Sequence, residues 1–486
     1  MQAIRNVMSF CERRRRALQL LLALATTAGL MAFSAFAGPL ANLSFVETWE
    51  MRRVLIVVLL TPLAAVLGYA ILSRDLKWLE FLFVYFALTC AYVLRTTVFN
   101  QVTPDHTAQR LFVEALAQDG LSAASQGAGR YGLLGVYGYA LISRIPFREL
   151  YMIKLASIVF DFALAFAARA LVERFVDRRR GTLALLAVLY CPLTWLTGAY
   201  WAQWDALCAL LCVLSLYALL SRRRTLCAVL FALAYAAGAE ALFCLPLLLL
   251  WPHGGLRLRA LAEALLTLLL CALPLALADS PETALAALSP ARLFAFSQDQ
   301  LAYCAPSLYQ FVPAASMSYR EQFGYLEFVP GVYTGEMNKW FTQETLDRLQ
   351  AAGVWAAGIA LGAGAWLAWR LRRHVPRSAL WQALLLCALA VPMLLPGMSA
   401  RSFFLPAFVS MFYALRHERR IRVCVLVAGA TMLGYVPALT GQYVLPMTAA
   451  MAMNLLAALQ AVCDLRASLA PGLRASGAGA HARQRI

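Results

Sequence analysis

The chain has 486 residues, of which 62% are apolar and 14% are charged, and its mean hydropathy is +0.68. Apolar stretches of about 16–22 residues recur along most of it, close to the roughly 20 residues that a helix needs to cross a bilayer, so the composition excludes an ordinary soluble protein. The net charge of +17 does not indicate nucleic-acid binding, because the basic residues cluster in short runs between apolar segments, such as 13–16, 178–180, 222–224 and 416–422.

The first expected element has two interpretations. Residues 17–37 follow the basic run "RRRR" and end in "AFA", which fits either a cleaved signal peptide or an uncleaved first transmembrane helix. We favour the uncleaved helix, and in both cases residue 45 is expected to face outside.

The apolar segments predict an all-α polytopic membrane protein with about 13–14 transmembrane helices. With the N-terminus inside, the basic runs fall on the cytoplasmic side, as the positive-inside rule requires, and Arg52 with Arg53 is the one local exception. The predicted spans are 17–37, 54–73, 78–98, 152–172, 182–199, 204–221, 225–238, 240–251, 258–277, 351–370, 378–396, 403–415, 423–438 and 443–462.

Residues 225–251 test this topology. One long helix would place the basic residues of "RLR" at 257–259 outside, whereas two short spans that break near "GAE" at 238–240 keep them inside. We therefore predict a hairpin with Glu240 near its outer tip. Broken helices are tolerated at membrane depth where they are buried in protein or line a cavity, so this hairpin is expected to border a functional cavity.

Two predicted outer loops are long. In the first, 99–151, the residues Leu111, Phe112, Ala115 and Leu116 have helical spacing and predict an interfacial helix. The second, 278–350, is rich in Tyr, Phe, Gln and Pro. The predicted organisation is thus N-terminal helices at 1–77, a transmembrane module at 78–277, the outer loop at 278–350, a C-terminal module at 351–465 and a disordered cytoplasmic tail at 466–486.

Several ionisable side chains lie within or next to predicted spans, where they are functional candidates by default. They are Asp105, Lys154, Asp161, Asp205, Glu240 and Arg401. All except Asp161 map to the outer half of the predicted topology, where they would line an outward-facing cavity. Structural alternatives are helix capping for Asp105 and Asp205, an ion pair of Lys154 with Asp161, a solvated loop position for Glu240 and contact with lipid phosphates for Arg401.

Four stretches, in order, resemble bacterial membrane glycosyltransferases of the GT-C superfamily, the mannosyltransferase-like branch that uses polyprenyl-phosphate sugars. The first three are "TPDHTAQRLFVEAL" in the first outer loop, "YMIKLASIVFDFALAF" in the fourth span and "GAYWAQWDALCALLCVL" around the start of the sixth. The fourth comprises "CAPSLYQFVP" at 304–313 and "LLPGMSARSFFLPAF" at 394–408. The similarity covers roughly residues 78 to 415 and rests on the order and spacing of these motifs.

This resemblance implies the GT-C fold and an inverting hexosyltransferase that acts at the outer face of the plasma membrane. It implies that Asp105 is the general base and that Arg401 lies near the donor phosphate, where Lys154 could assist. The substrate-binding candidates are Trp201, Gln203, Trp204, Asp205, Glu240, Tyr309 and Gln310. Gln203 and Asp205 would bind sugar hydroxyls or orient the first loop. Trp201 and Trp204 would offer a surface to a sugar ring or prenyl chain, or serve as ordinary belt residues.

The proposed chemistry accounts for these residue types. A displacement at the anomeric carbon needs one base for the acceptor hydroxyl, and a phosphate leaving group needs positive charge, which Arg supplies. No cofactor is required, although Asp105 with His106 could bind a divalent metal. The expected partners are a polyprenyl-phosphate-linked sugar, membrane lipids and an acceptor that is a lipid, a glycan or a protein.

Two departures from the family pattern affect positions expected to contact substrate. Ser399 and Ala400 stand where the family has His and Glu, and Gly238 and Glu240 stand where Lys and Gln are usual. These changes leave open a non-catalytic scaffold. A transporter or lipid flippase is the other alternative, although such proteins tend to have repeated halves, which this chain lacks. The twelve cysteines lie mostly in apolar runs and are interpreted as packed hydrophobes.

Overall fold

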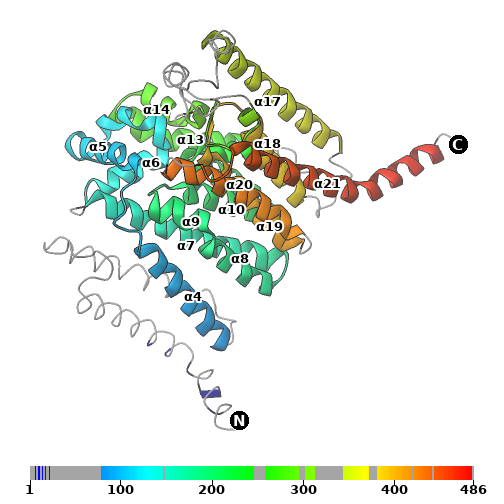
Figure 1. The fold of residues 1–486 in the computed structure, drawn as a ribbon, viewed down its shortest axis with the longest axis horizontal. Coiled ribbons are helices and arrows are strands. Elements are labelled where there is room, and N and C mark those ends of the chain that lie inside the picture. The colour runs from blue at the N-terminus through cyan, green and yellow to red at the C-terminus, as the bar shows by residue number, and fades with distance from the viewer. Residues whose placement is uncertain are drawn as a thin grey trace, which may run out of the picture. The chain divides into compact units, whose positions relative to one another are not determined.

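The computed structural model describes residues 78–145, 148–245, 258–294, 301–311, 343–371, 380–417, 420–440 and 443–483, together with residues 6, 9, 10, 14, 17 and 21. The predicted spans 17–37 and 54–73 lie outside the described residues apart from residues 17 and 21, as does most of 240–251. The described part of the chain is mostly helical (Figure 1).

The helices of the first half are α4 (Trp78–Thr96), α5 (Pro104–Asp119), α6 (Ala128–Ile142), α7 (Glu149–Phe175), α8 (Arg178–Tyr190), α9 (Pro192–Trp195), α10 (Asp205–Leu220) and α11 (Arg224–Ala237). Four of them, α4, α7, α10 and α11, fall on predicted spans. Helices α5 and α6 lie in the predicted outer loop 99–151, and α8 and α9 divide the predicted span 182–199. Short 3-10 or π turns join some of them: η2 (Gly120–Gln126), η3 (Leu196–Tyr200) and η4 (Ala239–Cys244). The helix predicted in the first outer loop is α5, in which Phe112 and Leu116 are buried and Leu111 is exposed.

The second half contains further helices and one short pair of strands. The helices are α13 (Leu258–Ala278), α14 (Pro281–Leu288), α17 (Gln343–Leu371), α18 (Leu380–Leu394), α19 (Phe404–Arg416), α20 (Ile421–Thr440) and α21 (Met447–Arg483). The short turns are η5 (Pro290–Phe294), η6 (Leu308–Phe311) and η8 (Ala400–Phe403), and the strands are β1 (Ala302–Tyr303) and β2 (Met398–Ser399).

Within the described residues, 5 helices are long and apolar enough to cross a membrane, or up to 6 if one bent pair forms a single span. They are Trp78–Thr96, Glu149–Phe175, Arg259–Ala278, Ile421–Thr440 and Met447–Ser468, and the bent pair is Arg178–Tyr190 with Pro192–Tyr200. Helices of this length and composition are those of an all-α membrane-embedded protein.

The structure differs from the predicted tail and agrees with the predicted break. Helix α21 continues to Arg483 and so includes residues 466–483, where a disordered tail was predicted, although Pro471 and three glycines in this segment disfavour a helix. Helix α11 ends at Ala237, Gly238 is extended with φ of −154°, and η4 follows. The chain therefore breaks at the predicted glycine.

The chain divides into two compact units, which are described separately. One comprises Met1–Gly120, Gly138–Phe166 and Leu185–Ala206, and the other comprises Leu121–Tyr137, Ala167–Ala184 and Leu207–Ile486. In the second unit, α20 packs against α19 and α21 and α11 packs against α13. The eleven cysteines in the described part are free thiols, and four of them, Cys208, Cys227, Cys244 and Cys304, are buried.

Candidate functional site

An irregular turn in the first unit sets the positions of Trp201 and Gln203. Helix α8 ends at Tyr190 and Pro192 begins α9, which is bent by 44° from α8 and leads into the π turn η3. Ala202 follows with a φ of 61°, in the left-handed region that residues with a Cβ seldom occupy. Such π turns and strained residues are frequent at functional sites.

Both side chains that flank Ala202 bind the carboxylate of Asp105. The indole Nε1 of Trp201 donates to Asp105 Oδ2 at 2.8 Å, and the amide Nε2 of Gln203 donates to the same oxygen at 3.1 Å. Trp201 and Gln203 are buried, whereas Asp105 is half-buried. This three-residue cluster, Asp105 with Trp201 and Gln203, is called the carboxylate clamp below.

The structure separates Asp105 from its alternative role as a helix cap. The N-cap of α5 is Thr103, and Pro104 occupies the first helical position. Asp105 lies in the first turn of α5, where the helix dipole favours a negative charge. Its carboxylate instead accepts from Trp201 and Gln203, so Gln203 contacts the first loop, and its two predicted roles stay predictions.

Gln109, also on α5, contacts the backbone of the strained turn at Ala202. Its Nε2 donates to the backbone oxygen of Ala202 at 3.0 Å and to the hydroxyl of Tyr139 at 3.3 Å, and Gln109 is fully buried. Because Gln109 follows Asp105 by four residues, both lie on the same face of α5. One helix face therefore contacts both the backbone and the side chains of the turn.

Trp204 packs among aromatic rings and does not join the clamp. It stacks on Tyr139 with ring centroids 4.7 Å apart and meets the edge of Phe160 at 5.6 Å, while its Nε1 donates to the backbone oxygen of Ile153 at 3.2 Å. A Cβ at Gly138 would lie 2.2 Å from the Trp204 ring, so glycine is required there. Tyr139 thus covers one face of the ring that was predicted to receive a sugar or prenyl chain.

Asp205 begins α10 and is half-buried.

Lys154 and Asp161 do not pair with each other, contrary to the predicted structural alternative. The Lys154 ammonium donates to the backbone oxygens of Val98 at 2.8 Å and Gln101 at 2.6 Å, just after α4 ends. Asp161 pairs instead with Arg95, whose Nε lies 2.9 Å from Asp161 Oδ2, and both side chains are fully buried. Lys154 therefore ties the end of α4 to α7, and its assignment to a donor phosphate stays a prediction.

The pair of Arg95 and Asp161 lies under the same irregular turn. Arg95 Nη1 also donates to the backbone oxygens of Ala91 at 3.1 Å and Leu189 at 3.0 Å. A Cβ at Gly198, within η3, would lie 3.0 Å from Asp161 Oδ2 and 3.1 Å from Oδ1. The backbone of η3 therefore packs directly against the buried carboxylate, and glycine permits the close approach.

His106 contacts an acidic residue that the sequence did not single out. Its Nε2 lies 3.5 Å from Glu149 Oε1 at the start of α7, with the imidazole 6% and the carboxylate 22% exposed. Within the described ranges, no three His, Cys, Asp or Glu side chains are grouped so that they could hold a metal ion.

In the second unit, Glu240 lies near a buried arginine. Arg292 donates to the backbone oxygen of Tyr235 at 2.8 Å, and its guanidinium lies 5.4 Å from the centre of the Tyr235 ring. Burial lowers the pKa of Arg292, an effect that Tyr235 and Glu240 partly offset. Glu240 itself is half-buried in η4, so it is not a fully solvated tip residue.

The two stretches of the fourth family motif lie side by side in the second unit. Strands β1 and β2 pair in parallel, with Ala302 opposite Met398 and Tyr303 opposite Ser399. Tyr309 donates to the backbone oxygen of Leu394 at 2.9 Å, and Gln310 Nε2 donates to that of Ala305 at 2.7 Å. Arg401 follows β2 in η8 and is half-buried. Tyr309 thus links the two stretches, whereas the bond of Gln310 lies within the first of them.

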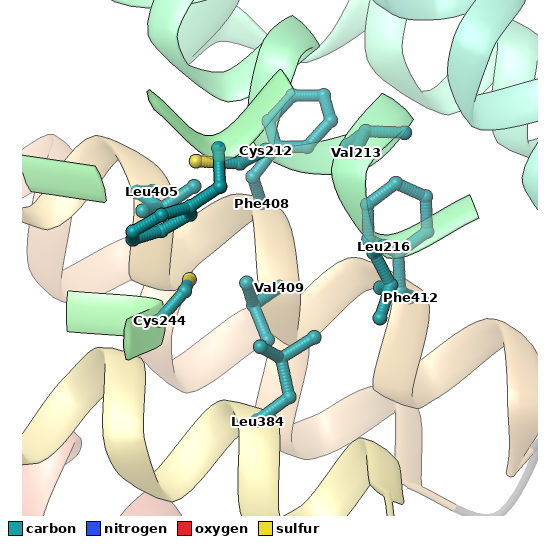
Figure 2. A pocket seen from close by; sticks show the side chains of 10 residues that line it. Cys212, Val213, Leu216, Cys244, Leu384, Leu405, Phe408, Val409 and Phe412 are labelled. Atoms are coloured by element: carbon teal, nitrogen blue, oxygen red, sulfur yellow. The ribbon is translucent and has the colours of Figure 1, made fainter. Parts of the chain in front are cut away.

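A separate apolar pocket lies in the second unit (Figure 2). Two thiols, Cys212 and Cys244, and aliphatic and aromatic side chains such as Leu384 and Phe412 line it. Because these side chains offer almost no hydrogen-bonding groups, the pocket does not suit a sugar, and it differs in kind from the carboxylate clamp.

No protein-family model matches the chain, and no curated protein matches it either. The candidate residues are therefore weighed on their geometry. The first unit brings together Asp105, Trp201 and Gln203, while Glu240, Tyr309, Gln310 and Arg401 belong to the second.

Three residues of the first unit escaped the sequence-based selection: Arg95, Gln109 and Glu149. Arg95 could have been selected by the criterion used for the others, because it is an ionisable residue inside a predicted span. Gln109 could have been found from its position four residues after Asp105 on the same helix face. Glu149 gave no signal, because it precedes a predicted span in a loop of unknown course.

Proposed function

We propose that this protein is an integral-membrane inverting glycosyltransferase that transfers a hexose, mannose-like, from a polyprenyl phosphate to a cell-envelope acceptor at the outer face of the plasma membrane. The observation that carries the proposal is the carboxylate clamp. Trp201 and Gln203 both donate to one oxygen of Asp105, and they flank the left-handed residue Ala202. Backbone strain of this kind is concentrated at functional sites. The resemblance of the surrounding motifs to GT-C enzymes supports the same function.

The carboxylate clamp suits a general base that must be held in one orientation. Trp201 and Gln203 are N–H donors, so both need Asp105 Oδ2 as an acceptor, and two donors from one rigid turn restrict the rotation of the carboxylate. A base acts efficiently only when it lies within hydrogen-bond reach of the proton that it removes. The clamp supplies this preorganisation before substrate binds.

In the proposed reaction, the acceptor hydroxyl oxygen attacks the anomeric carbon of the donor while its proton moves to Asp105. The bond from that carbon to the phosphate oxygen breaks, and polyprenyl phosphate leaves as an anion. Arg401 is the proposed partner of that phosphate, because a guanidinium binds phosphate oxygens in a bidentate manner. No acid is needed to protonate the leaving group, in contrast to glycoside hydrolysis.

A transfer assay with the full-length protein in proteoliposomes tests this function. The donors are undecaprenyl phosphates that carry radiolabelled mannose, glucose or galactose, and the acceptors are envelope glycan, glycolipid and protein fractions. We expect label to leave the lipid donor and enter one acceptor fraction, with no transfer from nucleotide sugars. Movement of intact labelled lipid across the bilayer without cleavage would favour a flippase, and neither cleavage nor movement would favour a scaffold.

A further inference from the structure

Two buried acceptor atoms lie on the inner face of α5, beside the carboxylate clamp. They are His106 Nδ1 and Gln109 Oε1, and neither has a hydrogen-bond partner among the residues that the structure describes. His106 is 5% exposed and Gln109 is fully buried. The two residues are three apart on one helix and therefore share a face, and Gln109 also shares a face with Asp105, which lies four residues before it.

The neighbouring contacts identify both atoms as acceptors. The backbone oxygen of Ala202 can only accept, so the group of Gln109 that lies 3.0 Å from it is the NH₂, and Oε1 is the remaining atom. Glu149 Oε1 lies 3.5 Å from His106 Nε2, so an imidazole with a single ring hydrogen places that hydrogen on Nε2. His106 Nδ1 then offers a lone pair.

Buried acceptors of this kind need a donor, since leaving them without one costs free energy. A hydroxyl group is the donor that fits two acceptors next to a carboxylate, and a hexose carries several hydroxyls on one rigid ring. An amine or guanidinium donor is less suitable, because it would bring a charge beside the sugar that the clamp is proposed to serve.

We propose that His106 Nδ1 and Gln109 Oε1 accept hydrogen bonds from ring hydroxyls of the hexose that is transferred, and so select the sugar. This inference rests on the proposed function and names the substrate groups that its site recognises. His106 and Gln109 are binding residues here, and Asp105 remains the base. Glu149 is a positioning residue that fixes the hydrogen of His106 on Nε2.

Paired substitutions of His106 separate its two nitrogens. In His106→Gln the amide nitrogen can replace Nε2 and reach Glu149, but the acceptor at Nδ1 is lost. In His106→Asn the amide oxygen can replace Nδ1, but the contact with Glu149 is lost. Glu114→Gln is the matched control, because Glu114 lies on the same helix with a side chain that is 47% exposed and paired with Arg110.

The measurement is kcat/KM for two kinds of donor. One is the undecaprenyl-phosphate hexose that the wild type transfers, and the others are analogues of it that each lack one ring hydroxyl. In the wild type, removal of the hydroxyl that binds His106 should lower kcat/KM about tenfold or more, the scale of one lost hydrogen bond. In His106→Gln the parent donor should lose a similar factor and that analogue should lose nothing further. His106→Asn and Glu114→Gln should keep the sensitivity to the missing hydroxyl.

The same comparison of the parent donor with its monodeoxy analogues, in wild type and variant, applies to Gln109→Met, for which a different ring hydroxyl should matter. Because the cycle compares two donors in one variant, a general loss of activity through the turn at Ala202 cancels. Thermal melting of each variant confirms that it is folded.

The result that overturns the inference is equal sensitivity of wild type, His106→Gln and Gln109→Met to every missing hydroxyl, with transfer otherwise intact. The two acceptors would then be satisfied by buried water, and the proposed function would stand. If the wild type transfers no hexose from any lipid donor, the proposed function fails and this inference fails with it.

Discussion

Asp105→Asn is expected to lower the rate of hexose transfer by about 10²–10⁴-fold, the contribution of a positioned general base. The substitution is nearly isosteric, and the amide oxygen can still accept from Trp201 and Gln203, so the clamp should keep its geometry. The amide cannot take up the proton of the acceptor hydroxyl. The loss should therefore fall on kcat, with KM for the lipid donor little changed.

The matched control for this substitution is Asp119→Asn. Asp119 ends the same helix and is exposed, so its change alters the charge of α5 equally without touching the clamp. Transfer rates and thermal melting of both variants should be measured in the same proteoliposomes. Transfer by Asp105→Asn at the rate of the control would remove Asp105 from the mechanism.

Asp161→Asn is expected to destabilise the protein by about 3–5 kcal/mol, the range found when one partner of a buried ion pair is removed. Arg95 would then remain fully buried with no carboxylate at 2.9 Å, although it keeps its hydrogen bonds to Ala91 and Leu189. The double variant Arg95→Met/Asp161→Leu should be less destabilised than the sum of the two single changes, because it leaves no unpaired charge.

Unfolding in denaturant of the purified protein, of Arg95→Met, of Asp161→Leu and of the double variant measures this coupling. A matched change on an exposed pair, Glu114→Gln beside Arg110, should cost at most about 1 kcal/mol. Transfer should fall with Asp161→Asn as well, since Gly198 of η3 packs on that carboxylate. Additive effects of the single changes would mean that the two charges do not stabilise each other.

Several helices could be predicted from the sequence because apolar length and basic runs are local properties of the chain. Helices α4, α7, α10 and α20 fall on predicted spans, and the break after α11 falls at Gly238. The helix of the first outer loop was predictable for the same reason, from the spacing of Phe112 and Leu116.

The partners of the charged residues could not be predicted from such local patterns. Asp161 pairs with Arg95, 66 residues away, and not with Lys154 two turns earlier on its own helix. Spacing along one helix shows which residues share a face, but the neighbouring helix decides which residue meets them. Lys154 illustrates the same point, because its partners are backbone oxygens, which every residue carries.

The geometry of the clamp was only partly predictable. The motif similarity singled out Asp105 and Gln203, and the structure places their side chains in contact. The left-handed conformation of Ala202 could not be predicted from the sequence, because glycine or asparagine usually occupies a left-handed position and alanine rarely does. Its backbone oxygen accepts from Gln109 of α5, a residue distant in the sequence, and sequence spacing does not reveal such a contact.

The central claim is that one carboxylate, Asp105, suffices for a direct displacement at the anomeric carbon. The anomeric configuration of the product tests it most directly, measured by NMR after transfer of a ¹³C-labelled hexose from a β-linked undecaprenyl phosphate. Direct displacement inverts that carbon, so an α-linked product is expected. A β-linked product would require two displacements through a covalent intermediate, and it would contradict the account.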